Sequence, residues 1–201
     1  HNGHFNVQKN KAFMKISGGA AKGIPIHVPK TDGLRPASSS SRERLFSSLG
    51  KRVEGAFFLD LFCGSGSYGL EALSRGAKSG TFVDRDFRAT QCVRRNLAQV
   101  CKSANRLDDN FEIVTCDVLK WKSRDVGPFD LVFADPPYPL IQEIGSKLFA
   151  KLLIDELVGD ETLVALELPG EVQLEPEGWR LERRLGKARK GSPSHALYRI
   201  R

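Results

Sequence analysis

Three glycines with the spacing G-x-G-x-x-G, at Gly64, Gly66 and Gly69, separate an apolar run from a run of helix-forming residues. Glycine permits positive φ and close approach of the backbone to a ligand, and backbone N–H groups at a helix start bind anions. Asp84 follows about twenty positions later, where such motifs place an acid that holds ribose hydroxyls. The pattern predicts a cofactor loop for either a nicotinamide or flavin dinucleotide or S-adenosylmethionine.

A second motif, Asp135-Pro136-Pro137-Tyr138, follows another apolar run. Successive prolines fix φ and prevent helix or sheet, so the loop is stiff and its carbonyls are free to accept hydrogen bonds. Acceptors held beside an aromatic ring suit a flat group that carries N–H donors. In isolation such a segment is more often a plain proline turn with a packed tyrosine. At the end of a strand beside the glycine loop, it predicts a substrate pocket.

The segments around these two motifs alternate between predicted strands and predicted helices. Apolar runs predict strands at 56–61, 80–84, 111–116, 129–134 and 162–168, and helical spacing predicts helices after the glycine loop and at 87–100 and 141–153. A terminal antiparallel strand pair is expected at 179–185 and 195–200. This alternation predicts an α/β, Rossmann-like fold whose mostly parallel central sheet has helices on both faces.

Ligands bind such sheets at the carboxyl ends of the strands. The acids that end the predicted strands, Asp60, Asp84, Asp117 and Asp135, should therefore gather at one edge.

The N-terminal part is expected to precede the main domain, which spans residues 36–201. Two short apolar segments, 15–17 and 24–28, lie between glycines and predict a β-hairpin extension within residues 14–35. Residues 1–13 are polar and are expected to be a vector-derived remnant or a disordered arm. A serine run then predicts a helix from Ser38 or Ser39, with a flexible linker as the alternative. Arg35 and Arg42 would then flank a loop able to bind phosphate or carboxylate, and both are expected to contact RNA.

The 201-residue chain has a formal net charge of +7 and a pI of about 9.4. This basic balance favours a polyanionic partner, of which nucleic acid is the leading candidate. Lys187, Arg189 and Lys190 share a glycine-flanked loop that we expect to contact RNA, although a charged loop alone is usually a solvated hairpin tip. The four cysteines and four histidines show no ligand spacing, so no metal and no disulfide framework are expected. With no long apolar run, we expect a cytoplasmic monomer that does not bind membranes.

The motifs also resemble a known family. D-L-F-C-G-S-G with D-P-P-Y is similar to motifs I and IV of the S-adenosylmethionine-dependent amino methyltransferases. L-R-P, R-E-R-L-F, G-L-E-A-L-S-R-G-A and the closing A-L-Y-R-I resemble, more narrowly, the RsmD-type 16S rRNA guanine-N2 methyltransferases. The resemblance runs from about Met14 to the C-terminus. It implies the methyltransferase fold for residues 36–201, S-adenosylmethionine as cofactor, and ribosomal RNA as partner, naked or in a small-subunit assembly particle.

The resemblance also implies roles for individual residues. Cofactor contacts would come from Asp60, Phe62, Gly64, Ser65, Gly66, Asp84, Arg85, Asp117 and Val118. Asp60 would face the methionine moiety, Asp84 the ribose and Asp117 the adenine amine, while the loop from Asp135 to Tyr138 would hold the target base. One departure lies at positions 39 and 40, where serines replace the Asp and Arg usual in the family.

Methyl transfer from a sulfonium is an in-line displacement, so placing the nucleophilic nitrogen accounts for most of the catalysis. An acceptor-only carboxylate at Asp135 matches guanine, which presents N1–H beside its N2 amine, better than adenine or cytosine. The alternatives are adenine-N6 or protein-glutamine methyltransferases, which use similar loops. More distant alternatives are a nicotinamide-dependent oxidoreductase, which would leave D-P-P-Y unexplained, and a non-catalytic RNA-binding protein.

Overall fold

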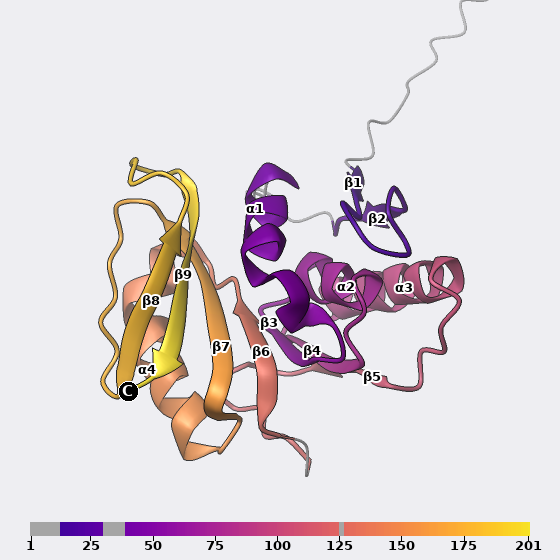
Figure 1. Ribbon diagram of the computed structural model, residues 1–201. Helices are drawn as coiled ribbons and strands as arrows, with labels where there is room; N and C mark the ends of the chain where they lie inside the picture. The colour runs from indigo at the N-terminus through magenta and orange to yellow at the C-terminus, as the bar shows by residue number, and fades with distance from the viewer. Residues whose placement is uncertain (1–12, 30–38, 125–126) are drawn as a thin grey trace, which may run out of the picture.

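The computed structural model describes residues 13–29, 39–124 and 127–201. Its centre is a seven-stranded sheet in the order β5-β4-β3-β6-β7-β9-β8 (Figure 1). The strands are β3 (Phe57–Leu61), β4 (Ser79–Asp84), β5 (Phe111–Thr115), β6 (Phe129–Ala134), β7 (Val158–Pro169), β8 (Trp179–Leu185) and β9 (Pro193–Ile200). The strands from β5 to β7 are parallel, and β9 runs antiparallel to both β7 and β8. The predicted fold class is confirmed.

Helices cover both faces of this sheet because its central strands are apolar on both sides. The helices are α1 (Ser39–Leu49), α2 (Ser67–Ser74), α3 (Phe87–Ser103) and α4 (Ile141–Ile154), with short 3₁₀ turns at η1 (Gly50–Val53) and η2 (Tyr138–Leu140). Phe58 and Phe133 pack in one hydrophobic core with α1, α2 and α3. Their neighbours Leu59 and Val132 pack in a second core with α4. Successive strand residues thus serve opposite cores.

The N-terminal hairpin is present, but its first strand lies earlier than predicted. β1 (Phe13–Lys15) pairs antiparallel with β2 (Pro25–His27), whereas residues 15–17 were expected to form the strand. Backbone hydrogen bonds between the two segments continue to Ile16, whose N–H donates to the carbonyl of Ile24 at 3.0 Å. The next N–H, that of Ser17, donates instead to the carboxylate of Glu71 on α2, at 3.0 Å to the nearer oxygen. The hairpin is therefore anchored to the helix that follows the glycine loop.

α1 begins at Ser39, so the serine run enters a helix as expected. The predictions for residues 1–12 and for Arg35 lie outside the described residues. Within the described part of the chain, no helix is long and apolar enough to cross a membrane.

The strand order creates a switch point between β3 and β6. From β3 the chain continues outward to β4 and β5, and then returns to the other side of β3 as β6. Crossover connections leave β3 and β6 in opposite directions, which opens a crevice outside their carboxyl ends. Both sequence motifs follow these two strands.

Candidate active site

The glycine loop leaves β3 through three residues with positive φ. Phe62 has a φ of 54°, Gly64 of 53° and Gly66 of 79°. Phe62 is not a glycine, and holding it in this region costs on the order of 1 to 3 kcal/mol, which is typical of functional sites. Gly69 serves packing instead, because a Cβ there would lie 2.3 Å from the ring of Phe82. The loop can thus start α2 directly against the sheet.

Two acids hold this loop. Asp60 accepts the backbone N–H of Gly69 through Oδ2 at 2.9 Å. Asp84, at the end of β4, accepts the N–H of Gly64 through Oδ2 and that of Asp86 through Oδ1, both at 2.9 Å. Oδ1 of Asp60 is buried and has no hydrogen-bond partner among the described residues. Burial raises the pKa of Asp60 well above its usual range.

The other predicted cofactor residues lie along the same edge. Asp117 is exposed just beyond β5 and accepts the N–H of Leu119 at 2.9 Å, while Val118 is buried beside it. Arg85 is exposed next to Asp84. The carbonyl of Ser65 accepts from the amide of Asn96 at 2.9 Å, which ties the loop to α3. The expected gathering of acids at the carboxyl ends of the strands is therefore present, and their roles toward a cofactor remain predictions.

The D-P-P-Y segment begins beside the glycine-loop strand. The backbone N–H of Asp135 donates to the carbonyl of Leu61, the last residue of β3, at 3.3 Å. Pro137 is followed by a 3₁₀ turn closed by its carbonyl and the N–H of Leu140 at 2.9 Å. Asp135 and Tyr138 are both half-buried. The structure thus brings the two motifs together at the switch point.

A buried polar cluster behind this loop was not predicted. Glu167 of β7 accepts the hydroxyl of Tyr138 at 3.2 Å through Oε1, and the hydroxyl of Tyr68 through Oε2. The hydroxyl of Tyr68 also lies 2.7 Å from Nε2 of His195, and Nδ1 of His195 lies 3.5 Å from the hydroxyl of Ser41. The sequence offered one signal for this cluster, which is that Glu167 is a single acid within the apolar run of β7.

The cluster has unusual protonation properties. Burial raises the pKa of Asp135 well above its usual range, and the negative charge of Glu167 raises it further. Burial also raises the pKa of Glu167, although the hydrogen bonds from Tyr68 and Tyr138 oppose that shift. Burial lowers the pKa of His195 to about 3, so this imidazole is neutral near pH 7.

Arg42 does not lie where a phosphate could reach it, contrary to the prediction. Its side chain is fully buried, and its Nε lies 3.3 Å from Oε2 of Glu71. A second guanidinium nitrogen donates to the carbonyl of Lys15. Arg42 was counted as a surface cation because its helix begins in a polar serine run, but α1 turns this side chain toward α2. It joins α1, α2 and the hairpin.

The basic loop between β8 and β9 is on the surface at the active-site edge. Lys187, Arg189 and Lys190 are all exposed. Pro193 pairs with Pro169 at the carboxyl end of β7, and the N–H of Gly170 donates to the carbonyl of Ser192 at 2.8 Å. In Figure 1 this loop and the first turn of α1 lie at the same end of the molecule.

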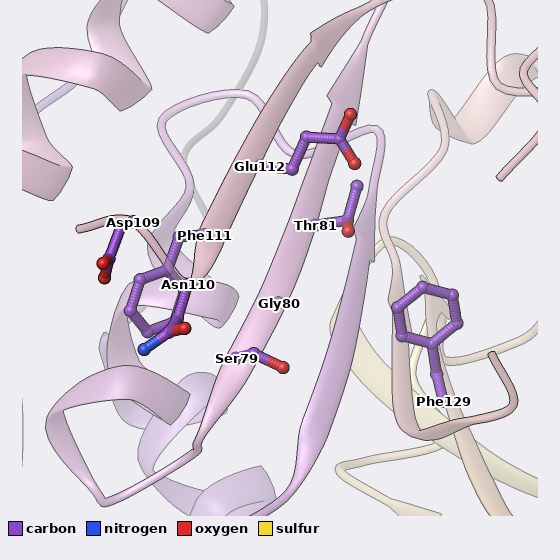
Figure 2. Close-up of a pocket in the computed structure, with 8 residues that line it drawn as sticks. All are labelled: Ser79, Gly80, Thr81, Asp109, Asn110, Phe111, Glu112 and Phe129. Atoms are coloured by element: carbon purple, nitrogen blue, oxygen red, sulfur yellow. The ribbon is translucent and has the colours of Figure 1, made fainter. Parts of the chain in front are cut away.

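A separate hollow of about 400 Å³ lies at the other end of the sheet. Figure 2 shows its lining, with Thr81 and Glu112 on the paired strands β4 and β5 and Phe129 across from them. Ser79 and Phe111 begin their strands, so the hollow opens at the amino ends. None of the acids of the candidate site lines it.

A doubly wound sheet with this strand order, a glycine loop at its switch point and acids at adjacent strand ends defines a Rossmann-like nucleotide-cofactor fold. Residues 14–198 match the family described as conserved hypothetical protein 95, and the chain belongs to that family. A curated relative, ribosomal RNA small subunit methyltransferase D of Escherichia coli (strain K12), is 34% identical over 175 residues, which cover 85% of this chain and 83% of that protein. The resemblance to the RsmD-type family is thereby confirmed.

Solved structures agree with this assignment. The Escherichia coli protein yhhF superposes with a TM-score of 0.79 at 28% identity, covering 94% of this chain and 98% of that one. An RNA methyltransferase from Salinibacter ruber, solved with S-adenosyl-L-homocysteine, has a TM-score of 0.61 at 17% identity, with 83% and 94% covered. At that identity the second likeness concerns the fold alone.

Proposed function

We propose that this protein is an S-adenosylmethionine-dependent methyltransferase that modifies the exocyclic N2 amine of a guanine in small-subunit ribosomal RNA. The observation that carries the proposal is the backbone hydrogen bond between Asp135 and Leu61, which starts the D-P-P-Y loop beside the strand that leads into the glycine loop. Membership of the family supports the RNA substrate, since the curated relative is named for the small subunit. We further propose that it acts in the cytoplasm as a monomer, on naked RNA or an assembly particle.

The chain's own residues fit this cofactor. Oδ1 of Asp60 is a buried acceptor without a partner in the described chain, and it suits the ammonium of a methionine moiety. Each Asp84 oxygen takes one backbone N–H and keeps a lone pair that a ribose hydroxyl could use. Asp117 would accept the adenine amine, with Phe62, Gly64, Ser65, Gly66, Arg85 and Val118 lining the rest. When bound, the cofactor supplies an electrophilic methyl group on a sulfonium.

Asp135 and Pro136 would orient the target amine. Its lone pair is delocalised into the base, so the nitrogen must pyramidalise before it can attack. The carboxylate of Asp135 and the carbonyl of Pro136 would accept its two N–H bonds and direct the lone pair toward the methyl group. Tyr138 would stack on the base. Such a pocket requires a flipped or single-stranded nucleotide.

Guanine is favoured by hydrogen-bond matching at Asp135. Guanine N1–H and N2–H are adjacent donors, whereas adenine N1 is an acceptor that an ionised carboxylate would repel. This matching applies to the ionised carboxylate of Asp135. Because the pKa of Asp135 is raised, that form is reached at a higher pH than for an ordinary aspartate. An adenine-N6 or protein-glutamine substrate is the nearest alternative, and a nicotinamide-dependent oxidoreductase is a distant one.

Calorimetry and methylation mapping test the proposal together. S-adenosylmethionine or S-adenosylhomocysteine should bind saturably, and NAD should not. Mass spectrometry of small-subunit RNA from cells with and without the gene should then locate one N2-methylguanine that depends on it. If NAD bound saturably and neither methionine derivative bound, the proposed cofactor would be wrong. If the gene-dependent modification were a methyladenine, the proposed target base would be wrong.

A further inference from the structure

We infer that Glu167 is a positioning residue for the reaction, which holds the ring of Tyr138 in place for the target base through a hydrogen-bond chain from α1 to the D-P-P-Y loop. This chain, the polar relay, consists of Ser41, His195, Tyr68, Glu167 and Tyr138. The inference rests on the proposed function, because it assigns a supporting residue to the proposed base pocket.

Glu167 is placed to serve two loops at once. Its side chain is buried, at 5% exposure, and each carboxylate oxygen accepts one tyrosine hydroxyl. Tyr68 lies in the first turn of α2, directly after the glycine loop, and Tyr138 ends the D-P-P-Y motif. A single carboxylate therefore links the proposed cofactor loop to the proposed base loop.

The direction of each hydrogen bond follows from the donors available. With Glu167 ionised, the one hydroxyl hydrogen of Tyr68 goes to Oε2. The Tyr68 oxygen, 2.7 Å from Nε2 of His195, then accepts from a neutral imidazole that is protonated at Nε2. Nδ1 of His195 is left as an acceptor facing the hydroxyl of Ser41 at 3.5 Å. With Glu167 ionised and accepting on both oxygens, every member of the polar relay thus has a compatible hydrogen-bonding role.

Aromatic packing holds Tyr68, the central member of the polar relay, in place. The ring of Tyr68 stacks on Phe133 of β6, with centroids 5.7 Å apart and an interplanar angle of 14°. It also meets the His195 ring edge-on at 5.6 Å. Tyr138, in contrast, is half-buried at the start of the short 3₁₀ turn η2, and we infer that its hydroxyl bond to Glu167 sets its ring orientation. A fixed ring lowers the entropy lost when the base is placed for in-line attack.

The test removes this contact from each side. Tyr138→Phe keeps the stacking ring and deletes only the hydroxyl, and Glu167→Gln offers a single acceptor oxygen. Tyr198→Phe is the matched control, because its buried hydroxyl donates to the carbonyl of Leu174 at 2.9 Å within the opposite core. Each purified variant is assayed for turnover on small-subunit RNA particles, for KM for RNA, for melting temperature and for S-adenosylmethionine affinity.

We expect Tyr138→Phe and Glu167→Gln each to lower kcat about tenfold, with cofactor affinity and the KM for RNA changed by less than about twofold. The double variant should be no slower than Glu167→Gln alone, because both changes act on the hydrogen bond between Tyr138 and position 167. Tyr198→Phe should keep wild-type kcat. Wild-type turnover by Tyr138→Phe, a variant that a half-buried site tolerates, would overturn the inference alone, as would additive losses in the double variant. Failure of the wild-type protein to methylate any small-subunit particle would overturn the proposed function as well.

Discussion

Asp135 and Glu167 lie next to each other at the carboxyl ends of two parallel strands, because Ala134 of β6 pairs with Leu166 of β7 and each acid follows its paired residue. Strand residues alternate between faces, so both acids fall on the side covered by α1, α2 and α3. Burial raises the pKa of Asp135 well above its usual range, and the neighbouring charge of Glu167 raises it further, because two nearby carboxylates oppose each other's ionisation. The proposed acceptor of the target amine is therefore sensitive to pH.

Methyl transfer should fall as the pH is lowered, and it should begin to fall above the range of an ordinary aspartate. Only ionised Asp135 accepts both guanine N–H groups, and its raised pKa means that it takes up a proton at a higher pH than usual. The charges of Glu167, Asp60 and Asp84 all raise the pKa of Asp135. Glu167→Gln removes one of these charges, so the normalised profile of kcat against pH should move to lower pH. A wild-type profile that stays flat down to about pH 5 would contradict this prediction.

Asp84→Ala and Asp135→Ala should separate cofactor binding from transfer. Asp84 braces the glycine loop through Gly64, so its loss should weaken S-adenosylmethionine binding, measured by calorimetry. Asp135 is proposed to contact the base instead, so its loss should abolish turnover and leave the cofactor affinity nearly intact. Near-normal turnover in Asp135→Ala would remove the D-P-P-Y loop from the proposed mechanism.

Asp135→Asn should impair a guanine substrate strongly despite its similar shape. The amide offers one acceptor oxygen and turns a donor toward the base, so one guanine N–H loses its partner at a cost of roughly 1 to 3 kcal/mol. Single-turnover rates on small-subunit RNA measure this directly. Unchanged rates would favour the adenine alternative, for which one acceptor suffices.

Replacing Lys187, Arg189 and Lys190 together with Ala should weaken RNA binding without affecting the cofactor. These side chains are exposed beyond the end of β7, on the edge that carries Asp135. Phosphate contacts position RNA without reading its sequence, and each one lost should lower the slope of log affinity against log salt by roughly 0.7 to 0.9. A wild-type salt slope in the triple variant would show that the loop is only a solvated tip.

Arg42→Ala should destabilise the fold without changing the salt dependence of RNA binding. Its loss leaves Glu71 buried with one fewer cation, and breaking a buried ion pair costs on the order of 3 kcal/mol. Arg44 is exposed on the same helix, and Arg44→Ala should alter the free energy of unfolding by less than about 0.5 kcal/mol in urea titrations. Equal stabilities of the two variants would refute the structural role of Arg42.

The order and type of the strands and helices, and the edge of the sheet at which the motifs meet, could be predicted from local sequence patterns. The strands at 129–134 and 179–185 have the predicted bounds. The first is a mainly apolar run bounded by turns, which is a local signal, whereas the second alternates with charged residues at the edge of the sheet. Glycine spacing likewise predicted the turn after β3. Once a parallel sheet was inferred, the acids Asp60, Asp84, Asp117 and Asp135 had to lie at its carboxyl edge.

Which side chains contact one another across that edge could not be predicted from local patterns, because it depends on how distant segments pack together. Tyr68 and Glu167 are 99 positions apart, and Tyr68 and His195 are 127 apart. Their contacts depend on strand order and on the register of β7 with β9, in which Glu167 pairs with His195. The pattern of apolar and polar residues along the chain specifies neither the strand order nor this register. The burial of Arg42 has the same cause, because whether a helix turns a cation toward solvent or toward a buried carboxylate depends on what packs against it.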